Sequence, residues 1–346
     1  MAKARIILGL MTFGPDADKG ARVTDIEDFK KALDVFQGYG YDEVDTARIY
    51  VGGLQEGYTR QAGWKERGLS LATKVYPVTP GIHKPATLTE YFETSLKELG
   101  SDSVDIFYLH AADRSVPFAE TLEAVDKLHK AGKFKRLGLS NFTAFEVAEI
   151  ALTAKYNGWV RPSVYQGMYN VILRSIEAEL IPACRRYGLD LVVYNPIAGG
   201  LLSGKVASTD AKDIPTEGRY SDKFLNGAAR ARYWRNGTFA AVDAMRETAA
   251  KHGISMIEIA LRWLVHHSAL DVYGKQFHDG IIIGASSLAH LESNLKDLAK
   301  DPLPQEILDE VDDAWRLAKV DTSPYWHLDL KYTYDTQEEL FGEGKK

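Results

Sequence analysis

The sequence predicts an α/β fold: a (β/α)₈ TIM barrel formed by a single domain with long loops and a C-terminal tail. Short apolar runs alternate with longer amphipathic runs, and through Asn195 the ends of the short runs recur roughly every 26 to 36 residues, the size of one strand–helix unit. Several of the short runs, such as VDIFYLH and LVVYN, are rich in β-branched and aromatic residues, which favour strands. Strands that alternate with helices form parallel sheets, and right-handed crossovers can close such a sheet into a barrel.

The predicted strands are short and apolar, and most of them end at or just before a polar residue. They are Arg5–Leu10, Asp42–Asp45, Leu69–Lys74, Val104–His110, Leu137–Ser140, Val164–Tyr169, Leu191–Asn195 and Gly280–Ile283. Between the first two, Ile26–Phe36 repeats apolar residues at helical spacing. A second helix is expected over Leu88–Leu99, with Thr87 or Thr89 as its N-terminal cap and Gly100 directly after its end.

Two stretches depart from this rhythm. Val206–Asn236 is polar without a clear period and is predicted to be a long loop after the seventh strand, and Leu270–Asp279 is predicted to be a second insertion. No linker divides the chain. Residues 1–320 are therefore expected to form the barrel, and residues 321–346 a tail that belongs to the same domain and lies at the active-site face.

Composition narrows the class of protein. The 346 residues are 45% hydrophobic and 26% charged, which is ordinary for a globular chain, and the net charge of −6 gives no indication of nucleic-acid binding. The single cysteine, Cys184, allows no disulfide within the chain. The opening MAKARIILGL is predicted to be a strand rather than a signal peptide, and no apolar run approaches the roughly 20 residues of a membrane helix. We therefore expect a cytoplasmic protein that binds neither nucleic acids nor membranes.

Polar side chains gather where the predicted strands end. In a barrel of this type the carboxyl ends of all strands meet at one face, which carries the active site. The residues there are Asp45, Tyr50, Lys74, His110, Ser140, Asn141, Gln166, Tyr194 and Asn195. Each alone has an ordinary explanation as a cap, a solvated strand end or a packed ring. Four titratable groups that converge on one face from successive strands favour a catalytic site instead.

These four groups, Asp45, Tyr50, Lys74 and His110, fit the chemistry of carbonyl reduction. The reaction delivers a hydride to carbon and a proton to the developing alkoxide. A lysine ammonium beside a tyrosine would lower the pKa of the phenol and ease proton transfer, and Asp45 would keep Lys74 charged. His110 would donate a hydrogen bond to the carbonyl oxygen. We therefore expect Tyr50 to be the proton donor.

An ordered set of motifs resembles the aldo-keto reductases. The motifs cover nearly the whole chain at matching strand positions: VDTARIY (Val44–Tyr50), ATK (Ala72–Lys74), YLH (Tyr108–His110), GLSNF (Gly138–Phe142), YQGMYN (Tyr165–Asn170), YNPIAGGLLSGK (Tyr194–Lys205) and IIIGASS (Ile281–Ser287). The resemblance implies a TIM-barrel reductase that uses NADPH, with Tyr50 as proton donor and Asp45, Lys74 and His110 as its partners.

The resemblance also implies where the cofactor NADPH binds. Ser140, Asn141 and Gln166 match the groups that hold the nicotinamide carboxamide, and Tyr194 matches the ring that stacks on the nicotinamide. The loop over the pyrophosphate corresponds to Asn195, Pro196, Ala198, Gly199, Gly200, Leu202, Gly204 and Lys205, with Arg219 on a cofactor phosphate. The segment around the adenosine phosphate corresponds to Gly284, Ala285, Ser286, Ser287, His290 and Asn294.

Further strings resemble the branch of aflatoxin-aldehyde and succinic-semialdehyde reductases. They are GRYSDKF (Gly218–Phe224), ARARYW (Ala229–Trp234), ALRWLVHHSAL (Ala260–Leu270) and DAWRLA (Asp313–Ala318). The branch implies a substrate-side arginine at Arg232 and a homodimer. Two positions depart from it, because Ala229 replaces a tyrosine and His327 replaces an arginine. We therefore expect a neutral aromatic or bulky aldehyde, bound by His110, Arg232, Phe13, Trp234 and Trp326.

Three other functions fit parts of the sequence. Gly199–Val206 nearly matches a phosphate-binding P-loop, but Val206 stands where a Ser or Thr would hold magnesium. His266 and His267 are adjacent and so point to different helix faces, which disfavours a metal-dependent hydrolase; no metal is expected. A cofactor-binding subunit of the same fold without turnover is the remaining alternative, since fold does not fix function.

Overall fold

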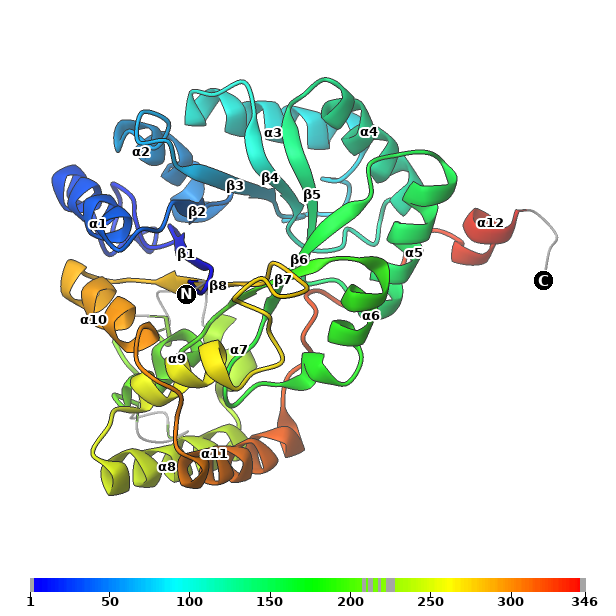
Figure 1. Ribbon diagram of the computed structural model, residues 1–346. Helices are drawn as coiled ribbons and strands as arrows, with labels where there is room; N and C mark the ends of the chain where they lie inside the picture. Colours follow the sequence, from blue (N-terminus) through cyan, green and yellow to red (C-terminus); the bar gives the residue numbers. More distant parts are fainter. Residues whose placement is uncertain (1–2, 207–209, 211–213, 217–218, 222–227, 343–346) are drawn as a thin grey trace.

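The computed structural model describes residues 3–206, 210, 214–216, 219–221 and 228–342. Its strands are parallel and pair in sequence order from β1 to β8, and β8 pairs with β1 to close the barrel (Figure 1). They are β1 (Ile6–Gly9), β2 (Glu43–Asp45), β3 (Ser70–Val75), β4 (Val104–Leu109), β5 (Phe134–Ser140), β6 (Pro162–Met168), β7 (Asp190–Tyr194) and β8 (Gly280–Gly284). The predicted fold class and the order of all predicted strands are confirmed.

Helices surround the barrel, as Figure 1 shows. They are α1 (Ile26–Gly38), α2 (Gln55–Gln61), α3 (Pro85–Leu99), α4 (Phe118–Lys130), α5 (Ala144–Tyr156), α6 (Leu180–Tyr187), α7 (Ala228–Tyr233), α8 (Asn236–His252), α9 (Met256–His266), α10 (Leu288–Leu298), α11 (Gln305–Ala318) and α12 (Thr336–Phe341). Among the described residues, no helix combines the length and apolar character needed to cross a bilayer.

The first helix shows how sequence sets position. The Asp25 side chain accepts hydrogen bonds from two backbone N–H groups of the first turn of α1, which satisfies donors that a helix start leaves unpaired. The buried face of α1 includes Phe29, Leu33 and Phe36, at the spacing of one helical stripe. This stripe packs into the hydrophobic core, where Phe29 contacts Phe13 in the loop after β1.

Two predictions about local structure were wrong. Helix α3 begins at Pro85, earlier than Leu88, and neither Thr87 nor Thr89 caps it. Proline suits the first helical position because its missing N–H would be unpaired there, and Thr89 donates instead to the Pro85 carbonyl at 2.8 Å. The stretch Val206–Asn236 is not loop throughout, since it contains α7. Parts of it lie outside the described residues, as do parts of the string Gly218–Phe224.

The barrel interior is filled by side chains at its centre. One cluster of buried residues consists of Ile7, Ala72, Ile106, Tyr108, Val164, Val192 and Ile282, which come from β1, β3, β4, β6, β7 and β8. Tyr108 fits because its neighbour across the strand pair is Gly138: a Cβ at position 138 would lie 2.1 Å from the Tyr108 ring. The barrel is therefore a packed core below the strand ends rather than a pore.

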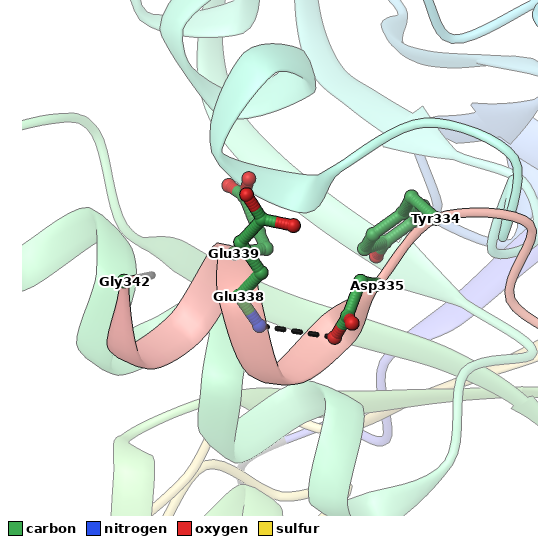
Figure 2. Close-up of a pocket in the computed structure, with 5 residues that line it drawn as sticks. All are labelled: Tyr334, Asp335, Glu338, Glu339 and Gly342. Atoms are coloured by element: carbon green, nitrogen blue, oxygen red, sulfur yellow. Dashed lines mark hydrogen bonds between the residues drawn. The ribbon is translucent and has the colours of Figure 1, made fainter. Parts of the chain in front are cut away.

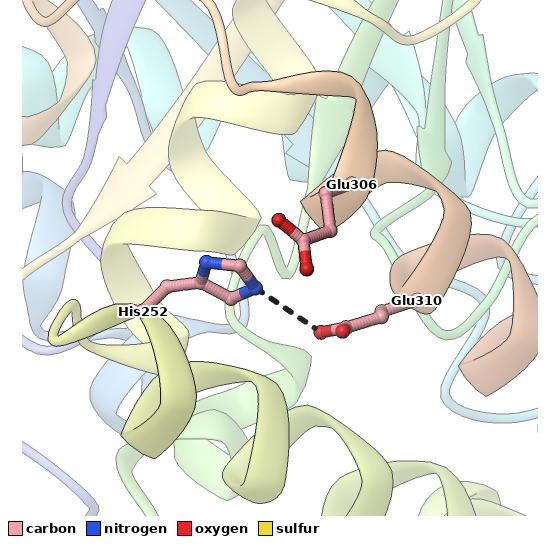
Figure 3. Close-up of side chains that lie close together, drawn as sticks. All are labelled: His252, Glu306 and Glu310. Atoms are coloured by element: carbon pink, nitrogen blue, oxygen red, sulfur yellow. Dashed lines mark ion pairs between the residues drawn. The ribbon is translucent and has the colours of Figure 1, made fainter.

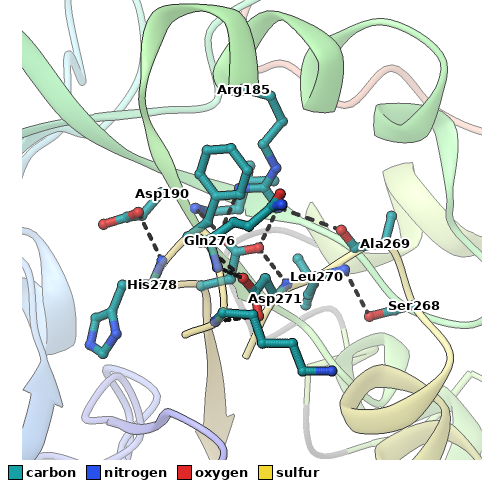
Figure 4. Close-up of polar contacts among 12 residues, drawn as sticks. Arg185, Asp190, Ser268, Ala269, Leu270, Asp271, Gln276 and His278 are labelled. Atoms are coloured by element: carbon teal, nitrogen blue, oxygen red, sulfur yellow. Dashed lines mark hydrogen bonds and ion pairs between the residues drawn. The ribbon is translucent and has the colours of Figure 1, made fainter. Parts of the chain in front are cut away.

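The amino ends of the strands carry ion pairs. Arg5 binds both carboxylate oxygens of Glu43, at 2.7 and 2.6 Å, and Arg136 pairs with Asp190 at 2.6 Å. Figure 4 shows the same end of β7 and β8, where Arg185 pairs with Asp279 and the Asp271 carboxylate accepts three backbone N–H groups of its own loop. These contacts fold the predicted insertion Leu270–Asp279 into an ordered turn.

The tail leaves α11 and ends in α12, which lies at the outer side of the molecule in Figure 1. A surface hollow beside α12 is lined by tail residues alone: Tyr334, Asp335, Glu338, Glu339 and Gly342 (Figure 2). None of these residues belongs to the predicted site. The part of the tail that precedes this hollow in sequence lies against the barrel, where its residues contact the loop after β4.

Candidate active site

The four predicted catalytic residues lie together at the carboxyl ends of neighbouring strands. Asp45 ends β2, Lys74 lies near the end of β3, and His110 directly follows β4. Lys74 is completely buried and forms an ion pair with Asp45, and its ammonium also donates to the Thr46 carbonyl at 2.8 Å. The ammonium nitrogen lies 5.3 Å from the centre of the Tyr50 ring. The charged pair is thus built into the wall beside the phenol.

His110 completes the cluster. Its ring lies edge-on to the Tyr50 ring, with centroids 6.0 Å apart, and edge-on to the Tyr76 ring at 5.2 Å. The buried Nδ1 atom of His110 has no hydrogen-bond partner in the part of the chain that the structure describes. A buried polar atom without a partner is costly, so a bound group that supplied one would be stabilised.

The pKa values of the cluster differ from the prediction in one respect. Burial raises the pKa of Tyr50 well above its ordinary value, and the nearby Asp45 carboxylate adds to the shift. Burial also lowers the pKa of Lys74, although Asp45 opposes this change. Burial and Asp45 together outweigh the positive charge of Arg219, so the expected lowering of the phenol pKa does not result. In this structure Tyr50 is a neutral phenol.

His110 is uncharged. Burial holds the pKa of its imidazole well below the ordinary value, and the positive charge of Lys74 adds to this shift. A neutral imidazole retains one N–H group, which is sufficient to donate a hydrogen bond to an oxygen atom.

A strained turn follows Tyr50. Val51 is buried and has φ of 50°, a left-handed conformation that a β-branched residue rarely adopts. Arg48 holds the turn, since it pairs with the buried Glu56 and donates to the Gly53 carbonyl at 2.6 Å. Glu56 also accepts from Thr73, next to Lys74, at 2.6 Å. Sequence reasoning missed Arg48 and Glu56, although Arg48 lies within the VDTARIY motif.

The predicted nicotinamide residues lie beside this cluster and are joined to it. Gln166 donates to Asp45 at 2.8 Å, and the Asn141 amide donates to the His110 carbonyl and to the Ser140 hydroxyl, both at 2.9 Å. The Tyr194 hydroxyl donates to Asn141 at 2.7 Å. The structure therefore brings Ser140, Asn141, Gln166 and Tyr194 to the same strand ends as Tyr50.

The predicted pyrophosphate loop follows β7. Gly199, Gly200 and Gly204 have φ of 66°, 99° and 74°, and a Cβ at Gly200 would meet no atom within 4 Å. Such turns let backbone N–H groups approach a phosphate. Asn195 and Ala198 also have positive φ, and Pro196 lies between them. Ala198 and Leu202 are buried and anchor the loop, whereas Lys205 is exposed.

The predicted adenosine-phosphate segment is the start of α10. Ser287 caps the helix by accepting from the His290 N–H at 3.2 Å, while Ser286 and the His290 ring form a pair at 2.7 Å. Gly284 and Ala285 lead into the helix, and Asn294 donates back to the Gly284 carbonyl at 3.3 Å. Ser286 and His290 are both exposed. The amino end of a helix favours an anion, which suits a phosphate.

Arg219 connects these two regions. Its guanidinium donates to the Asn195 side chain at 3.0 Å and lies 3.8 Å from where a Cβ of Gly284 would be. The positive charge of Arg219 also acts on Tyr50, since it opposes the rise in the pKa of the phenol. Arg219 is thus between the β7 loop, the end of β8 and the catalytic cluster.

The predicted substrate residues divide into two groups. Arg232 lies beside the strand ends, at the mouth of the barrel, and donates to the imidazole of His327. The Nε2 atom of His327 is also 3.3 Å from the Tyr194 hydroxyl. Trp326 is partly buried and packs against Tyr325. Phe13, in contrast, packs against Phe29 of α1 with ring centres 4.7 Å apart, so the structure does not bring it to the mouth.

Trp234 also has a packing role. Its ring lies 5.1 Å from Phe239 of α8 and 6.0 Å from Tyr220. Ala229 lies in α7, the same helix that carries Arg232. The ring of Trp234 is therefore explained by packing between α7 and α8 without a substrate.

One cluster of metal-ligand type was not predicted. His252 of α8 lies near Glu306 and Glu310 of α11, and its Nε2 atom is 3.5 Å from Glu310 (Figure 3). His252 is more than 50 residues away from Glu306 and Glu310 in the sequence, so no motif spacing indicates that they lie together. The ammonium of Lys251 already binds both carboxylates, at 2.7 and 2.6 Å, and thus provides the positive charge that a cation would bring.

Comparisons with known proteins identify the family of the chain. The aldo/keto reductase family model matches residues 5–316. The chain is 43% identical to an aldo-keto reductase of Pseudocercospora fijiensis. The aligned region of 298 residues covers 85% of this chain and 99% of that protein. It is 38% identical over 336 residues to human aldo-keto reductase family 7 member A3, covering 94% of this chain and 98% of the relative. Aflatoxin B1 aldehyde reductase member 2 of Mus musculus is also 38% identical, over 328 residues, 92% of this chain and 87% of the relative.

The match spans nearly the entire barrel, and Asp45, Tyr50, Lys74 and His110 lie together at the strand ends within it. The chain belongs to the aldo/keto reductase family and is an oxidoreductase that acts on carbonyl groups.

Proposed function

We propose that the protein reduces aldehydes to alcohols with NADPH and that Tyr50 donates the proton. The observation that carries the proposal is the position of the Tyr50 phenol beside the buried Lys74–Asp45 ion pair and the His110 ring. A general acid must carry its proton when the alkoxide develops, and an uncharged phenol does so. The resemblance to aflatoxin B1 aldehyde reductases supports an aldehyde as the class of substrate.

The division of roles follows from the geometry. When bound, the reduced nicotinamide supplies the hydride. Tyr50 releases its proton to the carbonyl oxygen as negative charge develops there. Lys74, fixed by Asp45 and Thr46, stabilises the phenolate that remains, and the N–H group of His110 donates to the same oxygen. His110 thereby contacts the substrate without changing its charge.

Several residues fit a dinucleotide with an extra phosphate. The glycine turn leaves room at Gly200 for a ligand to approach the backbone closely, and Lys205, Arg219 and the start of α10 offer positive charge or N–H donors. Ser286 and the cap residue Ser287 add hydroxyl donors. Ser140, Asn141, Gln166 and Tyr194 would hold the nicotinamide end.

The first expected result concerns the cofactor. Wild-type protein should oxidise NADPH with an activated aromatic aldehyde, and should bind NADPH more tightly than NADH. Arg219→Ala should weaken NADPH binding more than NADH binding, because a charge-assisted bond to a phosphate contributes roughly 1.5–3 kcal/mol. Fluorescence titration of both cofactors measures this. Equal affinity of the wild type for NADPH and NADH would contradict the cofactor assignment, and absence of turnover would favour a cofactor-binding subunit instead.

We also propose that the substrate is neutral and aromatic or bulky. Arg232 donates to His327, whose pKa is held well below its ordinary value by burial and by Arg232. The imidazole is therefore neutral, and Arg232 is the one cation of this pair. Trp326 lies next to His327 in the tail and would offer apolar surface to a ring.

The expected result is a higher kcat/KM for neutral aromatic aldehydes than for succinic semialdehyde. A carboxylate would have to compete with His327 for the guanidinium of Arg232. Steady-state rates with both substrate types on one enzyme preparation check this. A clear preference for succinic semialdehyde would mean that Arg232 binds a carboxylate unaided.

Three further features belong to the proposal. The barrel of residues 1–320 and the tail of residues 321–346 form one domain, which hydrogen bonds between Arg114 and the tail support. The protein acts in the cytoplasm, in line with its single unpaired cysteine. It forms a homodimer, which the resemblance to its branch supports.

A further inference from the structure

The loop after β4 carries Arg114, four positions beyond His110. Its guanidinium binds both carboxylate oxygens of Glu146, at 2.7 and 3.0 Å. Arg114 is 4% exposed and Glu146 is fully buried. Such a fork-to-fork pair fixes the plane of the guanidinium and is stronger than a single ion pair. Glu146 is held in turn, because it lies in the first turn of α5 and forms a capping box with Thr143.

The remaining donors of Arg114 face the tail. The Nη1 atom lies 2.9 Å from the carbonyl oxygen of His327, 3.2 Å from that of Asp329 and 3.4 Å from that of Leu328. Leu328 has φ of 61°, so the tail turns sharply where the guanidinium contacts it. The Arg114 carbonyl also accepts from the Thr333 N–H at 3.1 Å.

Glu146 holds the tail as well. The Tyr332 hydroxyl donates to this carboxylate at 2.6 Å. We call Arg114, Glu146 and Tyr332 the tail clamp. It joins the β4 loop and α5 to a segment more than 180 residues later in the chain.

The tail clamp brings one tail side chain to the active site. The His327 N–H donates to the Asn141 carbonyl at 3.1 Å, and the His327 imidazole lies between the guanidinium of Arg232 and the hydroxyl of Tyr194. Asn141 and Tyr194 are proposed cofactor residues, and Arg232 is the proposed substrate-side cation. His327 therefore connects all three.

We propose that Arg114 is a positioning residue, which sets the affinity for the carbonyl substrate by fixing His327 and, through it, Arg232. The proposal rests on the proposed function, because it assigns a role within that site. Arg114 does not contact the reacting atoms, so its loss should act on KM rather than on kcat. Its action should also depend on the presence of His327.

The test compares two arginines in matched surroundings. Arg114→Lys keeps the positive charge but loses the two parallel hydrogen bonds of the guanidinium to the Glu146 carboxylate. Arg5→Lys does the same at the opposite end of the barrel, where Arg5 binds both oxygens of Glu43 and donates to the His278 carbonyl at 2.6 Å. We expect Arg114→Lys to raise KM for an aromatic aldehyde roughly tenfold, in line with the loss of a hydrogen bond to a charged group. The kcat value and the NADPH affinity should change little.

A double-mutant cycle with His327→Ala separates positioning from general loss of structure. If Arg114 acts through His327, Arg114→Lys should raise KM much less in the His327→Ala background than in the wild type. Equal factors in both backgrounds would overturn the proposal. An equal rise of KM in Arg5→Lys would also overturn it, because that result would reflect stability alone.

A measurement without turnover separates failure of this proposal from failure of the proposed function. Trypsin cleavage after the exposed Lys331 reports opening of the tail. Cleavage there should be faster in Arg114→Lys than in Arg5→Lys or the wild type. Unchanged cleavage would show that Arg114 does not hold the tail and would overturn the proposal, even if reductase activity is found. Faster cleavage of Arg114→Lys in a protein without reductase activity would contradict the proposed function. It would still show that Arg114 holds the tail.

Discussion

Tyr50→Phe is expected to lower kcat for aldehyde reduction by roughly 10²–10⁴, the contribution of one positioned general acid. The substitution removes only the hydroxyl group, so the ring contact with His110 is retained. NADPH affinity should stay near the wild-type value, because the phenol is not among the residues proposed to hold the cofactor. Stopped-flow or steady-state NADPH oxidation measures the loss, and fluorescence titration measures binding.

A matched tyrosine provides the control. Tyr58→Phe likewise removes one hydroxyl group, which donates to the Thr24 carbonyl at 2.7 Å on the outer side of the barrel. The Tyr58→Phe variant should keep wild-type activity. The pH profile gives a second check. A group with a raised pKa is protonated below that pKa, so proton donation should persist through neutral pH and fall only as the pH rises toward the pKa of Tyr50. Wild-type turnover in Tyr50→Phe would contradict the assignment.

Lys74→Met is expected to reduce both stability and activity. It leaves Asp45 as a buried carboxylate whose remaining side-chain partner in the described residues is Gln166. Removing one member of a buried ion pair costs about 3–5 kcal/mol of unfolding free energy. Activity should fall as well, since Lys74 then no longer stabilises the Tyr50 phenolate. Urea unfolding and NADPH oxidation measure the two effects separately.

The double variant Asp45→Asn, Lys74→Met distinguishes stability from catalysis. It removes both charges, and replacing a complete buried pair is often neutral for stability. We expect it to recover much of the unfolding free energy lost in Lys74→Met and to recover little of the activity. A double variant as unstable as the single one would mean that the pair is not the reason for the loss. Recovery of activity would mean that Lys74 has no catalytic role.

The fold and the catalytic cluster were accessible from sequence because they depend on local pattern. Each strand is a short apolar run, and the residue at its end is a neighbour in sequence, so Asp45, Lys74 and His110 could be placed from strand ends alone. The closed, parallel arrangement then brings these ends together. The start of α3 was misplaced because two threonines suggested a cap, while Pro85 already provides a favourable first position.

The rest of the site depends on contacts between distant segments. Nothing in the sequence near His327 indicates that it meets Arg232, and nothing near Arg114 indicates that it binds the tail. The same holds for His252, whose partners lie on α11. An aromatic residue after a strand, such as Phe13, fits either a substrate wall or a helix contact, and in the structure Phe13 packs against Phe29.

The two ends of the barrel do different work. The ion pairs of Arg5, Arg136 and Arg185 lie at the amino ends of the strands, a barrel's length away from Tyr50. Substitutions there alter unfolding without touching the reacting groups, and substitutions in the carboxyl-end loops alter chemistry without breaking those pairs. The chain can therefore acquire new substrates by loop changes while its folding is maintained from the opposite end, which makes it a suitable scaffold for directed evolution.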